Sequence, residues 1–139
     1  MNLELLRADI TSLKVDAMVN ESAPSTLPVG QATVTSGGNL LCKFVIHAAV
    51  PRAGEDNGHG KLRAAMLSAL ERAEELAISS VGIPLMGSQA LPLEEIATVM
   101  IQAALDFRSR ARSLQRVVFC LFGAQAYDIF ERLLRELAE

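Results

Sequence analysis

The sequence predicts an α/β protein: a three-layer α/β/α sandwich built on a mixed central sheet of about six strands. The second half of the chain alternates between helical and strand patterns, which is typical of crossover connections onto a sheet covered by helices on both faces. The run from Lys43 to Ala49 is almost continuously apolar, as in a strand covered on both sides. The 139 residues fit one domain, which we assign to residues 1–139.

The first half of the chain consists mostly of predicted strands. Short strands are expected at 3–6, 16–19 and 32–35, where apolar or β-branched residues precede turn-forming ones. Segment 22–29 contains two prolines and several small polar residues, and segment 51–60 is polar and rich in glycine. Both compositions indicate loops.

The second half contains three predicted helices. Residues 61–77 form the clearest one, because their apolar side chains recur at helical spacing along one stripe. A second helix begins at Pro92, since proline suits the first helical turn. Residues 124–138 form the third. The strands that alternate with these helices are predicted at 80–84 and 116–122.

Charge and hydropathy argue against two classes of partner. The net charge is -3, and the densest basic stretch, Arg108–Arg112, is interpreted as a solvated helix end rather than a nucleic-acid site. No apolar run approaches the ~18 residues that a membrane-spanning helix needs. We therefore expect a cytoplasmic protein without a membrane or nucleic-acid partner.

The cysteines and histidines indicate no metal site. Cys42 and Cys120 are expected to be free thiols, with Cys120 in the core and Cys42 partly exposed. His47 is interpreted as a hydrogen-bonded core residue, and His59 lies in a loop without an obvious partner. These ligands are too few for zinc. No nucleophile has a convincing general base, so we predict no catalytic residue, metal or cofactor.

Ligands of open α/β sheets bind beyond the carboxyl ends of the strands, which nominates loops 7–12, 20–30, 84–92 and 122–125. Asp9 can accept a hydrogen bond from an exocyclic amine, or it can cap its own turn. Gly87 and Ser88 precede a helix and can present backbone N–H groups to a phosphate, although a simple turn explains them equally well. Phe122 can stack on a base or close the core.

Five sequence blocks follow one another in a characteristic order: Asp9–Thr11, Val15–Asn20, Gly30–Thr35, Phe44–Pro51 and Pro84–Ser88. Their combined order resembles the macrodomain family, the α/β modules known for binding ADP-ribose. The resemblance extends from Asp9 to the final helix. It implies that Asp9 binds the adenine amine and that the backbone at Ile10 fixes the base. It also implies that Asn20 contacts the distal end of the ligand or braces its own loop.

Both loops that hold the diphosphate depart from the family pattern. Family members have a long glycine-rich segment and a helix after the asparagine strand, whereas here residues 21–29 alone make the connection. The usual Asn-Ala-Ala-Asn is replaced by Asn20-Glu21-Ser22-Ala23, and the second loop retains a single glycine, Gly87. Three lost charge-assisted hydrogen bonds, at about 1.5–3 kcal/mol each, are enough to remove a micromolar affinity.

Three functions stay open at this point. The first is weak binding of ADP-ribose or a related adenine nucleotide through Asp9, Ile10, Phe122 and the Gly87–Ser88 loop. The second is a scaffold without a small ligand that acts as an interaction or homo-oligomerisation domain. The third is hydrolysis of ADP-ribosyl bonds through Asn20 and Glu21, which we do not expect.

Overall fold

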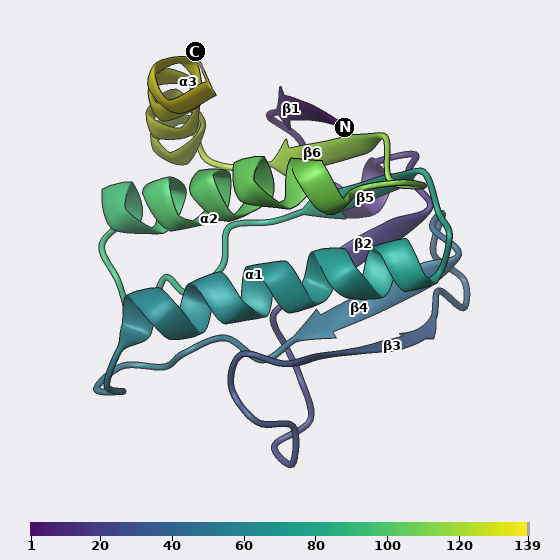
Figure 1. Ribbon diagram of the computed structural model, residues 1–139, viewed down its shortest axis with the longest axis horizontal. Coiled ribbons are helices and arrows are strands. Elements are labelled where there is room, and N and C mark those ends of the chain that lie inside the picture. The colour runs from purple at the N-terminus through teal and green to yellow at the C-terminus, as the bar shows by residue number, and fades with distance from the viewer. Residues whose placement is uncertain (139) are drawn as a thin grey trace.

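A six-stranded mixed sheet organises the computed structural model, which describes residues 1–138 (Figure 1). The strands lie side by side in the order β1-β6-β5-β2-β4-β3. All neighbouring pairs are parallel except β3 and β4, which are antiparallel. The strand bounds are β1 Asn2–Leu6, β2 Ala17–Asn20, β3 Ala32–Ser36, β4 Phe44–Ala48, β5 Ser80–Ile83 and β6 Arg116–Cys120.

In residues 1–138 an α-helix follows each of the strands β4, β5 and β6. Figure 1 shows α1 (Gly58–Glu75) and α2 (Leu93–Phe107) lying next to each other across one face of the sheet, while α3 (Ala124–Ala138) packs against α2 near β1. Pro92 is the N-cap residue of α2, and Glu94 and Glu95 in its first turn complement the positive end of the helix. Two short 3₁₀ helices, η1 (Ile10–Ser12) and η2 (Arg108–Arg110), complete the described elements.

The two faces of the sheet are covered differently. All three α-helices share one hydrophobic core with alternate strand residues such as Ile46 and Phe119. Val45 and Val118 are also buried, but they alternate with those residues and therefore point to the opposite face. There the segment before β2 supplies the cover over β5, since a Cβ atom on Gly82 would come within 2.9 Å of Leu13.

The predicted α/β sandwich on a mixed six-stranded sheet is therefore confirmed. Its two outer layers are unequal: within residues 1–138, the α-helices lie on one face, and the other face is covered by η1 and loops. The predicted elements agree with the observed ones to within a few residues, and the third helix begins and ends as predicted, at Ala124 and Ala138. No helix in this part of the chain combines the length and hydropathy needed to cross a bilayer.

Four single-residue predictions have definite outcomes. The prediction that His59 lies in a loop without a partner is wrong, because the residue lies in the first turn of α1 and its Nε2 contacts Oε1 of Glu95. Cys120 is buried, as predicted, but Cys42 is buried too, so its predicted partial exposure is wrong. Cys42 precedes β4 in a turn that folds its side chain inward, with 6% of the residue exposed. Both are free thiols in the structure. His47 is hydrogen-bonded as predicted, yet it is half-buried on the face without helices rather than inside the core.

Candidate functional site

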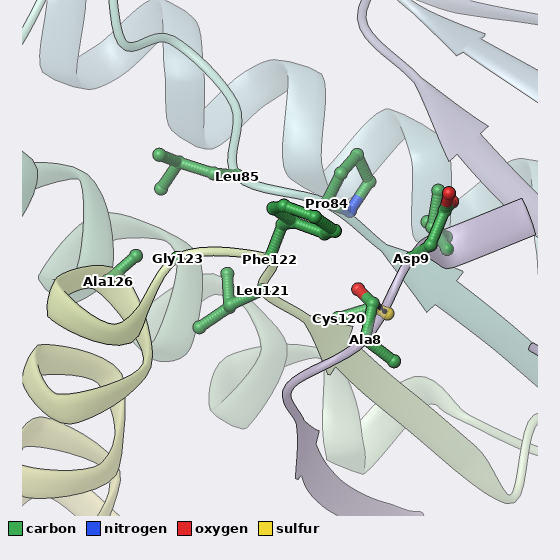
Figure 2. A pocket seen from close by; sticks show the side chains of 10 residues that line it. Ala8, Asp9, Pro84, Leu85, Cys120, Leu121, Phe122, Gly123 and Ala126 are labelled. Atoms are coloured by element: carbon green, nitrogen blue, oxygen red, sulfur yellow. Dashed lines mark hydrogen bonds between the residues drawn. The ribbon is translucent and has the colours of Figure 1, made fainter.

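A cavity of about 420 Å³ lies at the carboxyl edge of the sheet, where three neighbouring strands end. Figure 2 shows its side chains arriving from separate loops: Asp9 from the loop after β1, Pro84 from the loop after β5, and Phe122 from the loop after β6. Because β1, β6 and β5 are adjacent and parallel, their following loops meet at one place. We call this cavity the Asp9 cleft; it is lined by Ala8, Asp9, Ile10, Pro84, Leu85, Cys120, Leu121, Phe122, Gly123 and Ala126.

Asp9 combines the two roles that the sequence left open. Its Oδ1 accepts hydrogen bonds from the backbone N–H of Thr11 at 2.9 Å and from the Thr11 hydroxyl at 2.8 Å, which starts η1. These two bonds, the backbone one first, lower the pKa of the Asp9 carboxyl below its usual value, so the group is ionised at neutral pH. Within residues 1–138 the second oxygen, Oδ2, accepts no hydrogen bond, and Asp9 as a residue lines the cleft.

Phe122 is the most exposed large apolar side chain of the described residues. It follows β6 and leaves 79% of its surface open, whereas the preceding Leu121 is 1% exposed and belongs to the core. Phe122 therefore does not close the core. An exposed ring beside a largely apolar cavity provides a flat surface on which a planar base can stack. Ile10 lines the same cavity and is half-buried.

Gly87 and Ser88 line a second cavity of about 330 Å³, not the Asp9 cleft. This second cavity, the Gly87 cavity, lies beside the ends of β2 and β4 and also contains Glu21 and Arg52. Residues 84–88 border both cavities, since Pro84 lines the first and Gly87 the second. The two cavities are thus neighbours along one edge of the sheet.

The backbone N–H of Gly87 already has a partner in the chain. It donates a hydrogen bond of 3.0 Å to Oε2 of Glu21, a residue that follows β2. Gly87 adopts a φ of +78°, a backbone conformation that favours glycine, and an added Cβ would lie 3.2 Å from Leu62. The glycine is therefore required by the loop itself, whatever the loop binds.

Asn20 lines neither of these two cavities. Its Oδ1 accepts a hydrogen bond of 3.0 Å from the backbone N–H of Ser22, which fixes the turn after β2. The carbonyl of Ser22 in turn lies 3.3 Å from Nδ1 of His47, whose Nε2 lies 2.7 Å from the Thr35 hydroxyl. The structure thus gives Asn20 a bracing role and leaves its role as a ligand an untested prediction.

Sequence reasoning did not nominate as site residues several that line the cavities, among them Pro84, Cys120 and Arg52. The position of Arg52 just after β4 is the signal that was available, because loops after parallel strands gather at the same edge. Cys120 donates a hydrogen bond of 3.2 Å to the carbonyl of Ala8. Burial raises the pKa of the Cys120 thiol, which keeps the group neutral and a poor nucleophile.

These features define a class of protein: an α/β sandwich domain with two adjoining cavities at the carboxyl edge of its sheet. The family model of the Macro domain matches residues 11–100, which is more than half of the chain. The chain therefore belongs to the macrodomain family, and the resemblance inferred from the sequence blocks is confirmed.

Relatives and solved structures agree with this assignment. A protein of Saccharolobus solfataricus is 28% identical and matches over 99% of this chain and 94% of its own length. That match extends over 170 positions, more than the 139 residues of this chain, so the relative contains positions with no counterpart here. A macro domain-containing protein of Caldanaerobacter subterraneus is 30% identical over 79% of this chain, which spans only 65% of that protein.

Among solved structures, the Oceanobacillus iheyensis macrodomain has the same fold. Its structure with ADP superposes with a TM-score of 0.90 at 22% identity, and the match covers 98% of this chain and 91% of that one. A mutant form of the same protein was solved with ADPR and also gives a TM-score of 0.90. At this level of identity the likeness is one of fold.

Proposed function

We propose that this macrodomain binds ADP-ribose or a smaller adenine nucleotide weakly, with the adenosine part in the Asp9 cleft. The observation that carries the proposal is the pairing of Asp9 and Phe122 across one cavity. Asp9 offers a carboxylate oxygen that accepts no bond from residues 1–138, and Phe122 offers an exposed ring. The cavity volume of about 420 Å³ falls within the range of small-molecule sites. The Oceanobacillus macrodomain, which shares the fold, was solved with ADP and with ADPR.

The expected weakness follows from the surroundings of a bound diphosphate. Residues 21–31 connect β2 to β3 without a helix, so this connection supplies no helix N-terminus for a phosphate. The N–H of Gly87 already donates to Glu21. The adenosine end would therefore provide most of the binding free energy.

Calorimetric titration with ADP-ribose, ADP and adenosine tests the proposal. Phe122→Ala should weaken binding of all three ligands by about tenfold, because base stacking is worth about 1–3 kcal/mol. Asp9→Ala should weaken them similarly by removing the acceptor. Thr11→Val is the matched control, since it removes the Thr11 hydroxyl bond to Asp9 Oδ1 but leaves the carboxylate in place.

Two results would contradict the proposal. One is the absence of heat or thermal shift with all three ligands at millimolar concentration. The other is binding that Phe122→Ala and Asp9→Ala leave unchanged, which would place the ligand elsewhere.

A second candidate function is association with a second copy of the chain, and one observation favours it. Leu40 and Leu41, in the turn before β4, are 40% and 63% exposed. Exposed neighbouring leucines invite apolar contacts. Sedimentation at micromolar concentration should then show a dimer that Leu41→Ser converts to monomer, and a monomeric parent chain would exclude this function.

A further inference from the structure

The Gly87 cavity contains a negative charge at the position where a bound anion would have to form its hydrogen bonds. The Oε2 atom of Glu21 lies 3.0 Å from the backbone N of Gly87, although 66 residues separate the two in sequence. Gly87 is buried and Glu21 is exposed, so the carboxylate reaches in from the surface to the loop. A carboxylate oxygen and a phosphate oxygen are the same kind of acceptor for a backbone N–H.

The rest of the cavity has the polar character of an anion site. Its described lining includes the hydroxyl residues Ser22 and Ser88, the amide Gln89 and one cation, Arg52. Residues Gly87 to Leu91 form a turn in which the carbonyl of Gly87 accepts the N–H groups of Ala90 and Leu91. The N–H of Gly87 thus points away from its own turn and into the cavity, where Glu21 meets it.

The two cavities adjoin, which gives this contact a consequence for ligand choice. Because Pro84 and Leu85 line the Asp9 cleft and Gly87 and Ser88 line its neighbour, a ligand that extends from the cleft along the loop after β5 would place its next groups against Glu21. A phosphate there could not accept the Gly87 N–H, because that group already donates to Glu21, and the negative charge of Glu21 would repel it. An uncharged nucleoside confined to the Asp9 cleft would meet neither penalty.

We propose that Glu21 is a specificity-determining residue that occupies the Gly87 N–H in place of phosphate, so that the chain prefers adenosine to ADP and ADP-ribose. The expectation that adenosine binds in the Asp9 cleft rests on the proposed function. The expectation that Glu21 excludes phosphate rests on the Glu21–Gly87 contact alone. Glu21 holds the loop closed to anions, and removing its charge opens the Gly87 cavity to a phosphate.

Two variants of Glu21 separate its charge from its hydrogen bond. Glu21→Ala removes both, whereas Glu21→Gln removes the charge but keeps an amide oxygen that can accept from Gly87. Glu131→Ala is the matched control, because this substitution changes the net charge by the same amount as Glu21→Ala. Glu131 is an exposed residue of α3 that pairs with Arg135. In calorimetry, Glu21→Ala should bind ADP-ribose about tenfold more tightly than the parent chain, and Glu21→Gln should fall between them. Adenosine affinity should stay within about twofold in all variants, and the gain for ADP-ribose should shrink as salt is raised.

A second experiment tests the contact without the adenine cleft. The amide resonance of Gly87, followed by ¹H–¹⁵N NMR, should shift on titration of inorganic pyrophosphate into Glu21→Ala and stay still in the parent chain and in Glu131→Ala. If the Glu21→Ala resonance does not respond and ADP-ribose affinity is unchanged while adenosine still binds, Glu21 is only a loop brace and the inference fails. If adenosine does not bind but the Gly87 resonance of Glu21→Ala responds to pyrophosphate, the proposed function fails, while the inference that Glu21 excludes phosphate is supported. If neither ligand has an effect, both fail.

Discussion

The two faces of the sheet differ in what they require of the sequence. On the face covered by helices, strand residues such as Ile46, Val81 and Phe119 are 0% exposed and touch α1, α2 or α3. On the other face, Met18 and His47 are only partly buried, and Thr35 is exposed. One face is a packed apolar core, whereas the other combines buried apolar residues such as Val45 and Val118 with the hydrogen-bonded pair His47 and Thr35.

This difference shows which layer the stability of the domain depends on. Buried apolar area dominates the free energy of folding, and the face with the helices holds most of it. The opposite face also buries apolar residues, Val45 and Val118 among them, but fewer of them, and it therefore contributes less apolar area.

The largest expected effect is on the helical face. Phe119→Ala should lower the free energy of unfolding by about 3–5 kcal/mol, because it empties a fully buried site whose ring lies 5.6 Å from that of Phe130. Met18→Ala on the opposite face should cost less than about 1.5 kcal/mol, since the side chain is only partly buried. Urea unfolding of both variants measures the contrast, and equal losses would contradict the comparison.

Two carboxylates that bind backbone N–H groups should have effects on stability between those of the two faces. Glu74, on α1, accepts hydrogen bonds from the backbone N–H groups of Arg112, Ser113 and Leu114. Asp16, before β2, accepts the backbone N–H groups of Ser79 and Ser80 and the Ser79 hydroxyl. Glu74→Gln and Asp16→Asn should each cost about 1–2 kcal/mol at neutral pH, because charge-assisted bonds to backbone N–H groups are lost.

The same two carboxylates make the stability depend on pH. Burial opposes ionisation of Glu74, but its backbone N–H partners outweigh burial and lower its pKa; the N–H of Ser79 is the main cause of the lowered pKa of Asp16. A lowered folded-state pKa gives stability that is present above the unfolded-state pKa of about 4 and is lost as the pH falls through the folded-state value. The difference in unfolding free energy between the parent chain and each variant should therefore be smaller at about pH 3 than at pH 7. A gap that persists at low pH would show that charge is not the cause.

The smallest expected effect is on the open face itself. Thr35→Val removes the hydroxyl that lies 2.7 Å from Nε2 of His47, a contact in an exposed setting. The cost should be about 0.5 kcal/mol or less, because water replaces an exposed hydrogen bond at little cost. A thermal melt measures it. A loss as large as that of Phe119→Ala would mean that this face is as important to the fold as the helical one.

The sequence was a good guide to the elements and a weaker one to their distribution between the faces. Periodicity placed the helices because each has an apolar stripe, and the apolar run around Ile46 indicated a strand covered on both faces. Periodicity does not say which face of the sheet a helix covers, since that depends on the handedness and order of crossovers in space. The unequal outer layers were therefore not predicted, although the short connection at 21–29 was noted.

The sequence placed the candidate residues in loops at the carboxyl edge of the sheet, but it did not indicate that they line two separate cavities. Asp9, Ile10 and Phe122 line one cavity, whereas Gly87 and Ser88 line its neighbour. The bond from Gly87 to Glu21 spans 66 residues, and no local pattern announces a contact at that distance. The exposure of Phe122 stayed open in the sequence, because an apolar residue at a strand end can either close the core or face a ligand.

The pairing of the first strand with the last has a consequence for how the chain acquires its fold. Asn2 lies opposite Arg116 and Leu6 opposite Cys120, so β1 has no partner strand until β6 has been made. The backbone partners of Leu3 and Leu5 therefore exist only after the polypeptide has been synthesised as far as β6. The same pairing anchors the segment that follows β1 and carries Asp9 to the cleft, so residues at the two ends of the sequence jointly set the position of this carboxylate.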